Sequence, residues 1–257
     1  MLEARDLHIR LGRKPILTDV SCTAAPGEIT VIIGPNGSGK TTLLRALSGD
    51  IPYDGRVTLD GLDIATADPA FLAGIRAVLP QATPLAFPFT VHEVVSLGAT
   101  AGLSGADPTL ADRALAKVDL AGYGPRFYQE LSGGEQQRVQ LARILAQVWQ
   151  PLVDGAPRWL LLDEPVSSLD LAHQILVMRL AERFAQAGGG VVIILHDLNL
   201  TGMFADQVLL MSNGTLAQSG TPDRVLTDAN IGAAYGCRVR SRKTPREDSF
   251  FLLPHLI

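Results

Sequence analysis

Short runs of branched apolar residues recur in the first and last thirds of the chain. EITVII at 28–33, WLLLDEP at 159–165 and VVIIL at 191–195 contain runs with the length and composition of buried strands. Such strands alternate with helical stretches over residues 1–80 and about 157–236. This alternation predicts an α/β core.

Residues 82–150 have a different pattern. TVHEVVSLG, ADRALAKVDL and VQLARILAQ have the apolar spacing of helices rather than strands. We therefore expect a helical subdomain at 82–150, inserted between the two halves of the core. Within it, ATPLAFPFTV at 82–91 is an apolar stretch of a kind that a lone protein should not expose. Either a partner covers this stretch, or Phe87 and Phe89 pack beneath the loop.

The size and composition of the chain fit one α/β unit. With 257 residues and 47% apolar residues, one core with an inserted subdomain is expected rather than two independent domains. The sequence has no apolar run of about 18 residues, so we expect no membrane-spanning helix. Its start, MLEARDLHIRLG, carries charges where a signal peptide needs an apolar core.

Charge and cysteine content narrow the setting further. A net charge of −4 argues against a nucleic-acid partner. Cys22 and Cys237 are too far apart for a metal or redox motif, which favours a reduced, cytosolic setting. A basic cluster near the C-terminus is expected to be solvated, or else to touch lipid headgroups or a partner. It comprises Arg238, Arg240, Arg242, Lys243 and Arg246.

The glycine-rich motif GPNGSGKT lies between the first apolar strand and the helical stretch TLLRALSG. Its glycines allow backbone angles that bring successive N–H groups close to one anion, and the helix adds the positive end of its dipole. Lys40 can reach the β- and γ-phosphates of a nucleotide, and the Thr41 hydroxyl can bind Mg²⁺. The alternative is a plain strand-to-helix turn. The expected nucleotide-binding residues are Gly34, Pro35, Asn36, Gly37, Ser38, Gly39, Lys40, Thr41 and Thr42.

Two adjacent carboxylates end the apolar run WLLL. Successive side chains of a strand point to opposite faces, so Asp163 and Glu164 are expected to do different work. Asp163 fits a partner of Mg²⁺, together with Thr41. Glu164 is then expected to face the γ-phosphate and polarise the attacking water as general base. The alternative is a strand end with two solvated acids.

A second glycine motif, LSGGEQQRV at 131–139, opens a predicted helix. Ser132 is a good N-cap residue, and Gly133 and Gly134 leave backbone N–H groups exposed at the positive end of that helix. Such an end attracts an anion. Alone, however, the motif is equally typical of an ordinary capped helix.

The ordered set of motifs resembles the ATP-binding subunit of ABC transporters, over roughly residues 1–236. The resemblance implies a P-loop ATPase with a RecA-like core, an antiparallel β subdomain and an inserted helical subdomain, followed by a tail at 237–257. It also implies a head-to-tail homodimer with two ATP molecules at its interface. The matching motifs are GPNGSGKT (34–41), Gln81 in VLPQ, LSGGEQQR (131–138), LLLDEP (160–165), SSLD (167–170) and His196 in ILHDLN.

The resemblance assigns roles that single residues do not. It implies that Ser132, Gly133, Gly134 and Gln136 contact ATP bound to the other subunit, and that Asp170 helps to shape that opposite site. By itself, Asp170 would be taken for a helix cap.

Gln81 and His196 complete the expected catalytic set with Glu164. Gln81 is expected to touch Mg²⁺ or the attacking water, alongside Thr41 and Asp163 as metal-site residues. His196 is expected to contact the γ-phosphate and hold Glu164 and the water in place. Without the family, a lone Gln would be assigned to the surface and a lone His to a structural role.

One position departs from the family pattern. Where an aromatic residue usually stacks on adenine, this sequence has Leu11. Arg10 or Arg13 is an alternative neighbour for the base, so the contacts to adenine stay open.

Further segments resemble a narrower group, the importers of iron chelates, heme and vitamin B12. They are FPFTVHEVVSLG, the stretch from HDLN to PDRVL, and YGCRV. WQPLVDGAPRWLLLDEP is most similar to the heme importers. Heme is therefore the expected cargo, with ferric siderophore and B12 as alternatives. His92 and His173 are expected to be surface residues rather than heme ligands.

This resemblance implies an assembly at the cytoplasmic face of the bacterial inner membrane, in which the protein is peripheral. Two copies of a polytopic permease would bind the ATPase dimer, and a periplasmic substrate-binding protein would act indirectly. A non-transport ABC ATPase acting on DNA or ribosomes is less favoured, because the sequence shows no coiled-coil insertion, tandem cassette or basic face. Exporter ATPases are usually fused to their membrane domain.

Overall fold

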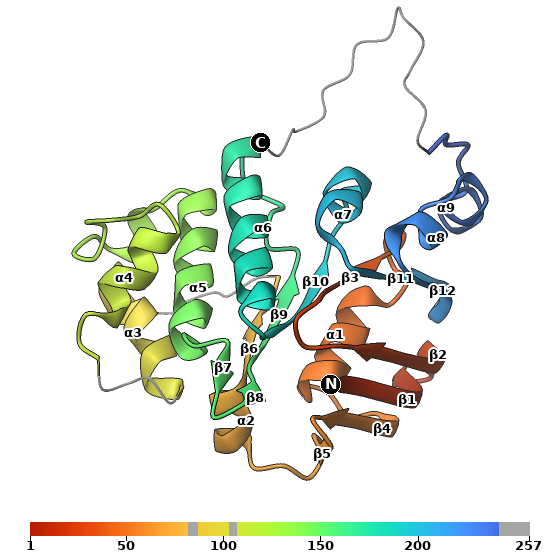
Figure 1. Cartoon of the computed structure of the whole chain (residues 1–257), viewed down its shortest axis with the longest axis horizontal. Helices are drawn as coiled ribbons and strands as arrows, with labels where there is room; N and C mark the ends of the chain where they lie inside the picture. Colours follow the sequence, from red (N-terminus) through yellow and green to blue (C-terminus); the bar gives the residue numbers. More distant parts are fainter. Residues whose placement is uncertain (82–86, 103–106, 242–257) are drawn as a thin grey trace, which may run out of the picture.

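The computed structural model describes residues 1–81, 87–102 and 107–241. Its central layer is a six-stranded sheet in the order β12-β11-β3-β10-β9-β6 (Figure 1). Five of these strands are parallel, and β12 runs antiparallel at one edge. The strands are β3 (Ile29–Ile33), β6 (Arg76–Leu79), β9 (Trp159–Asp163), β10 (Gly190–Ile194), β11 (Gln207–Ser212) and β12 (Thr215–Gly220).

A second sheet, antiparallel and four-stranded, forms the expected β subdomain in the order β2-β1-β4-β5. Helix α1 (Lys40–Ser48) buries Leu43, Leu44 and Leu47 in the apolar core that these strands share with the central sheet. The strands are β1 (Leu2–Leu11), β2 (Lys14–Ala24), β4 (Asp54–Leu59) and β5 (Leu62–Asp63).

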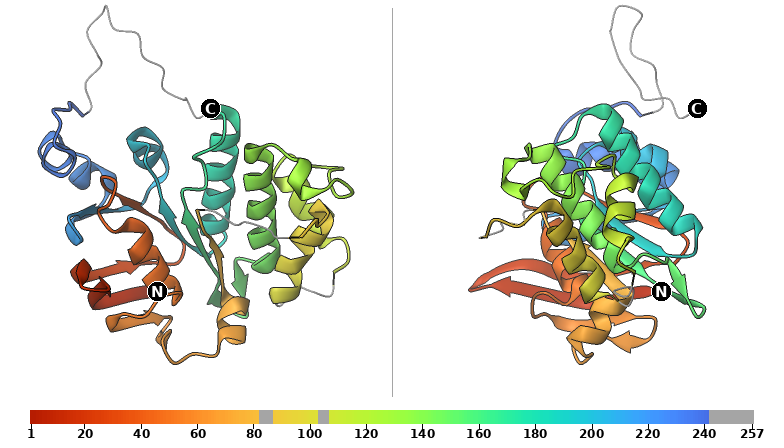
Figure 2. Two further views of the ribbon diagram at one scale, coloured as in Figure 1. Left: turned by 180° about the vertical axis from the view of Figure 1, so that it is seen from behind. Right: turned by 90° about the vertical axis from the view of Figure 1, so that its left-hand side faces the viewer.

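Three helices fall within the segment that the sequence assigns to a helical subdomain. They are α3 (Val91–Ala101), α4 (Leu110–Lys117) and α5 (Gly133–Gln147). Figure 2 shows this helical part and the antiparallel sheet toward opposite ends of the long axis. Glycines allow α3 to approach α5 closely, because a Cβ on Gly98 would lie 1.9 Å from the Arg143 carbonyl oxygen.

Helices α6 (Leu171–Gln186) and α7 (Leu198–Phe204) flank the central sheet. Helix α6 follows β9, and α7 follows β10. Their buried faces, including Val177 and Phe204, join the larger apolar core. The remaining helices are α2 (Pro69–Ile75), α8 (Pro222–Val225), α9 (Asp228–Tyr235) and a 3₁₀ turn at Tyr128–Glu130. None of the helices in the described part of the chain is long and apolar enough to cross a membrane.

The stretch WQPLVDGAPRWLLLDEP contains a small hairpin that the sequence analysis did not predict. Strands β7 (Leu152–Val153) and β8 (Ala156–Pro157) pair antiparallel around Asp154 and Gly155. Both turn residues have positive φ, 51° and 78°. Asp-Gly is a favoured dipeptide for such two-residue turns, so the local signal was present.

The two phenylalanines of the apolar stretch at 82–91 differ: Phe89 packs beneath the loop, while Phe87 is exposed. Residues 82–86 lie outside the described part of the chain. Phe89 is partly buried against the larger core, as the packing alternative requires. Phe87 is 68% exposed and meets Phe89 edge to face, with ring centroids 6.4 Å apart.

Two helical glycines provide a test of this packing. Gly98→Ala forces a methyl group into the backbone of α5, and we expect it to lower the free energy of unfolding by about 1–3 kcal/mol. Gly202→Ala, in α7, adds a methyl group 3.5 Å from a Leu226 side-chain carbon. We expect that control to be neutral or to stabilise by up to about 1 kcal/mol. Equal unfolding midpoints in urea for the two variants would contradict the close contact.

Candidate nucleotide-binding site

The phosphate loop leaves the carboxyl end of β3 under tight steric limits. Gly34, Gly37 and Gly39 have φ values of 148°, 78° and 98°, which glycine tolerates best. A Cβ on Gly34 would lie 2.3 Å from the Met211 carbonyl oxygen. Gly39 precedes α1 without a side-chain cap. The N–H groups at the start of α1 are therefore available to an anion.

Lys40 is buried and folded back across this loop. Its Nζ donates to the carbonyl oxygens of Gly34, at 2.9 Å, and Pro35, at 3.1 Å. Burial lowers the pKa of the Lys40 ammonium, against the opposing effect of Glu164 and Asp163. The Ser38 hydroxyl is buried and has no hydrogen-bond partner in the described structure. A phosphate in the loop would supply partners for both side chains.

Thr41 and Asp163 bring two oxygen donors together beside the loop. The Thr41 Oγ1 lies 3.4 Å from Asp163 Oδ1. Burial raises the pKa of Asp163, while the hydrogen bond from Thr41 acts in the opposite direction. Hydroxyl and carboxylate oxygens are suitable ligands for Mg²⁺, which takes its other ligands from water and phosphate. The donor set therefore fits the expected cation.

The side chains of Asp163 and Glu164 diverge because the chain turns at Glu164, not because both residues lie in a strand. β9 ends at Asp163, and Glu164 has a left-handed φ of 51°. The expectation that both residues lie in the strand was therefore wrong, although the two carboxylates do have different surroundings. The turn allows Glu164 Oε1 to lie 2.5 Å from His196 Nε2, while its Oε2 accepts from Gln81 Nε2 at 3.2 Å.

These three side chains come from the carboxyl ends of three neighbouring strands. His196 follows β10, Glu164 follows β9 and Gln81 follows β6. The structure thus brings together the three residues expected to be catalytic, beside the phosphate loop. Their roles in hydrolysis stay predictions.

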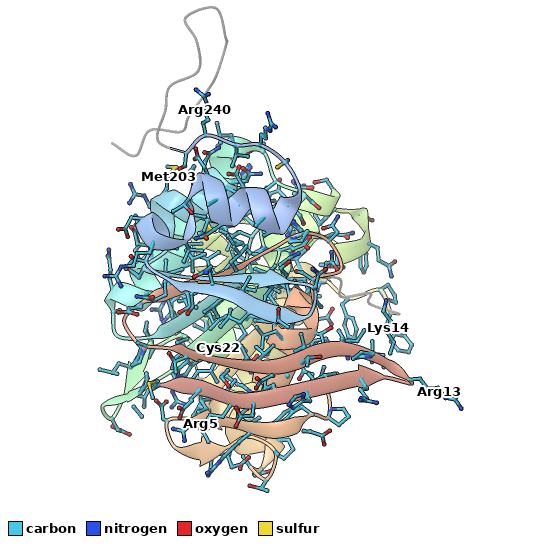
Figure 3. All side chains as sticks on the ribbon, turned by 90° about the vertical axis from the view of Figure 1, so that its right-hand side faces the viewer. Arg5, Arg13, Lys14, Cys22, Met203 and Arg240 are labelled. Atoms are coloured by element: carbon cyan, nitrogen blue, oxygen red, sulfur yellow. The ribbon has the colours of Figure 1, made fainter. Side chains whose placement is uncertain are left out.

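A cavity of about 550 Å³ joins these groups to the phosphate loop. Leu11, which replaces the usual aromatic residue, is 62% exposed and lies at its wall with Lys14 and Ile16. Of the described residues at this end of the β1–β2 hairpin, Arg10 and Arg13 do not line the cavity. Figure 3 shows Arg13 at the tip of the hairpin, directed away from the body of the molecule. The lining also includes Asn36, Gly37, Lys40, Thr41, Thr42, Gln81, Glu164 and His196.

The second glycine motif caps α5 through a reciprocal pair of contacts. Ser132 Oγ accepts from the Glu135 N–H, while Glu135 Oε2 accepts from the Ser132 N–H at 2.8 Å. Gln136 turns inward, donating to the carbonyl oxygens of Tyr128 and Leu131, each at 3.2 Å. In the described structure, residues 132–136 do not line the cavity at the phosphate loop of the same chain.

Gln137 is a site residue that the sequence analysis missed. Its Nε2 donates to the Glu164 carbonyl oxygen at 3.0 Å, and its Oε1 accepts from the Ser168 N–H at 3.3 Å. The same turn packs against Gly134, whose Cβ would lie 3.1 Å from the Ser168 carbonyl oxygen. The first turns of α5 therefore hold the segment that carries Glu164. The only sequence signal was the place of Gln137 within the motif LSGGEQQR (131–138).

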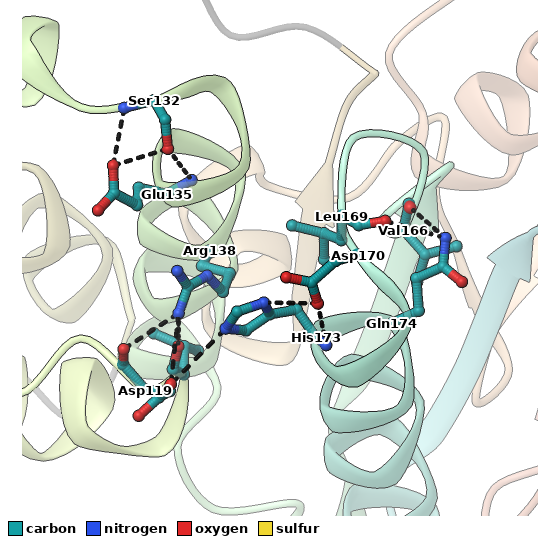
Figure 4. Close-up of polar contacts among 10 residues, drawn as sticks. Asp119, Ser132, Glu135, Arg138, Val166, Leu169, Asp170, His173 and Gln174 are labelled. Atoms are coloured by element: carbon teal, nitrogen blue, oxygen red, sulfur yellow. Dashed lines mark hydrogen bonds and ion pairs between the residues drawn. The ribbon is translucent and has the colours of Figure 1, made fainter. Parts of the chain in front are cut away.

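Asp170 caps α6 and is held by a wider polar network (Figure 4). Its Oδ1 accepts from the His173 N–H at 2.9 Å and lies 2.8 Å from His173 Nδ1. His173 Nε2 lies 3.6 Å from Asp119 Oδ2. Arg138 donates to the backbone carbonyl oxygen of Asp119 at 3.0 Å. The side chain of His173, expected at the surface, is 25% exposed and lies between the more exposed carboxylates of Asp119 and Asp170.

A parallel sheet, a glycine-rich phosphate loop that opens a helix, and a buried acidic strand end define the P-loop class of nucleotide-binding proteins. A family model described as ABC transporter matches residues 17–167. The chain therefore belongs to the ABC transporter family.

Curated relatives extend the similarity to the whole chain. The chain is 56% identical to the hemin import ATP-binding protein HmuV of Roseobacter denitrificans, over 99% of this chain and 97% of that protein. It is 54% identical to the protein of the same name from Rhizobium meliloti, over 99% of this chain and 98% of that protein.

Solved structures support the fold. A structure described as a metal-chelate type ABC transporter in an inward-facing conformation matches with a TM-score of 0.77 and 25% identity, over 97% of this chain and 94% of that one. The dimeric bacterial ABC transporter cassette MJ0796 matches with a TM-score of 0.74 and 25% identity, over 86% of this chain and 99% of that one.

The role of Gln137 can be tested by Gln137→Leu. This variant removes two hydrogen bonds to the turn that carries Glu164, and we expect kcat for ATP hydrolysis to fall about tenfold. The affinity for ATP should change little, because Gln137 does not line the phosphate loop. Gln186→Leu, at an exposed position in α6, is the matched control. Loss of ATP affinity in place of turnover would contradict this assignment.

Proposed function

We propose that the protein is the ATP-hydrolysing subunit of an ABC importer that moves heme across the bacterial inner membrane. The observation that carries the catalytic part is Glu164, held between His196 and Gln81 at the wall of the phosphate-loop cavity. The cargo assignment is supported by relatives at 52–56% identity over nearly the whole chain, which are named hemin import ATP-binding proteins.

The residues of the loop can bind ATP with little rearrangement. Backbone N–H groups at Gly37 and Gly39 surround the phosphates, and Lys40 moves from the carbonyl oxygens of Gly34 and Pro35 to the β- and γ-phosphates. Thr41 and Asp163 hold the site of Mg²⁺, which when bound neutralises charge that develops on the phosphates.

Glu164 accepts the proton of the attacking water. Its two carboxylate oxygens are already fixed by His196 and Gln81, so it needs little reorganisation to orient a water molecule toward the γ-phosphate. His196 also reaches toward the γ-phosphate. Gln81 donates directly to Glu164, so it is placed to respond to the presence of the nucleotide.

The catalytic unit is a head-to-tail homodimer. Ser132 and Gly133 are exposed and Gly134 is partly buried at the positively polarised end of α5, which lies outside the cavity of its own chain. In the dimer, this end contacts the γ-phosphate held by the partner, with Gln136 supporting it from beneath. Asp170 lies at the same face and shapes the opposite site. The dimeric arrangement described for the MJ0796 cassette supports this assembly.

Two copies of a polytopic permease receive the motion of this dimer. Phe87 is 68% exposed and lies six residues after Gln81 in the sequence, which makes it a candidate contact for the permease. The ATPase is peripheral, at the cytoplasmic face of the inner membrane, and a periplasmic substrate-binding protein delivers the cargo. No residue of this chain is proposed as a ligand for heme.

Glu164→Gln tests the chemistry. The amide cannot accept a proton, so hydrolysis should fall by about 10²–10⁴-fold while ATP still binds. Because ATP then stays at the interface, size-exclusion chromatography with MgATP should show a persistent dimer. Rapid turnover in this variant would remove Glu164 as the base, and a monomer at saturating ATP would count against the dimer.

The cargo is tested by reconstitution. The ATPase is assembled in proteoliposomes with a candidate permease and its binding protein, and ATP hydrolysis is measured with heme, a ferric siderophore or cobalamin. We expect heme to give the largest stimulation and to accumulate inside the vesicles. Stimulation by ferric siderophore or cobalamin alone would assign that cargo instead. A Glu164→Gln complex is the control for uptake that does not depend on hydrolysis.

A further inference from the structure

The C-terminal segment YGCRV has no part in the chemistry described so far, yet its tyrosine reaches the phosphate loop. Tyr235 is the last residue of α9, and its hydroxyl accepts a hydrogen bond from the Gly34 N–H at 3.0 Å. The two residues are 201 positions apart in the sequence. Burial raises the pKa of Tyr235, so its hydroxyl is neutral near pH 7.

Gly34 occupies the root of the loop, where displacement would affect every residue after it. β3 ends at Ile33, so the Gly34 N–H lies beyond that strand and needs another partner. One side of Gly34 lies against Met211 of β11, where a Cβ would come within 2.3 Å of the carbonyl oxygen. Tyr235 supplies a second restraint from a different element.

The restraint matters most when nucleotide enters. In the absence of nucleotide, Lys40 Nζ donates to the Gly34 carbonyl oxygen at 2.9 Å. Gly34 is then held by a side chain at both its N–H and its C=O. On the proposed function, Lys40 transfers to the phosphates and releases that carbonyl oxygen. Among the described side chains, Tyr235 is then the one that still holds Gly34 by a hydrogen bond.

We infer that Tyr235 is a positioning residue of the nucleotide site, which keeps the root of the phosphate loop in its binding geometry from the C-terminal helix. This inference rests on the proposed binding of ATP in that loop. It assigns α9, which lies beyond the residues matched by the family model, to the support of the site.

Helix α9 is anchored by more than this hydrogen bond. Ile231 is buried in the same apolar core as Val208 and Leu210 of β11, and the Tyr235 ring packs against that core. Asp228, at the start of α9, accepts from the Ser241 N–H at 2.6 Å. Tyr235→Phe should therefore leave α9 in place and remove only the acceptor of the Gly34 N–H.

The test uses the full-length ATPase and Tyr235→Phe. The variant leaves a buried N–H group unpaired, so the loop root is expected to relax and the KM for MgATP to rise about fivefold to tenfold. We expect kcat to change less than twofold, because Glu164, His196 and Gln81 are untouched. The Kd for a non-hydrolysable ATP analogue should rise by the same factor as KM.

Tyr53→Phe is the matched control. The Tyr53 hydroxyl is also buried, but it has no hydrogen-bond partner in the described structure. Its removal should leave KM, kcat and analogue binding unchanged. If Tyr235→Phe lowers the melting temperature but keeps wild-type KM and analogue affinity, Tyr235 is a structural residue and the inference is wrong. If the wild-type protein binds the analogue but does not hydrolyse ATP, the proposed function fails while the binding comparison still decides the role of Tyr235.

Discussion

The site depends on one constraint, the common carboxyl edge of β3, β10, β9 and β6. Parallel neighbours end at the same edge of a sheet, so the phosphate loop, His196, Glu164 and Gln81 converge although they are up to 162 residues apart (Gly34 to His196). Glycine then removes the side chain where the loop passes within contact distance of β11.

Helix α5 joins this edge to the helical part of the molecule. Its N-terminal turn exposes Ser132 and Gly133, while the next residues hold the segment after β9 through Gln137. The next residue, Arg138, donates to the carbonyl oxygen of Asp119, whose carboxylate lies beside the His173 and Asp170 pair. A rotation of α5 would therefore displace both Glu164 and Asp170.

The support of the phosphate loop is distributed over distant parts of the chain. Met211 from β11 limits Gly34 on one side, and Tyr235 from α9 binds its N–H on the other. The N-terminal hairpin adds Leu11 at the mouth of the cavity, where an aromatic side chain is usual in the family. Leu11 offers apolar surface at this position but no aromatic ring on which a base could stack.

The sequence by itself determined the features whose causes are local. A glycine loop between a strand and a helix, a Ser132 cap with Glu135 three residues later, and an acidic pair after an apolar run each follow from short-range geometry. The order of these motifs was enough to indicate the family and the residues around the phosphates. Tertiary structure decided the contacts that join distant segments. Gln137 to Glu164, His173 to Asp119 and Tyr235 to Gly34 span 27, 54 and 201 positions. A side chain's partner across such a separation depends on how strands and helices are stacked, and no local pattern records that stacking.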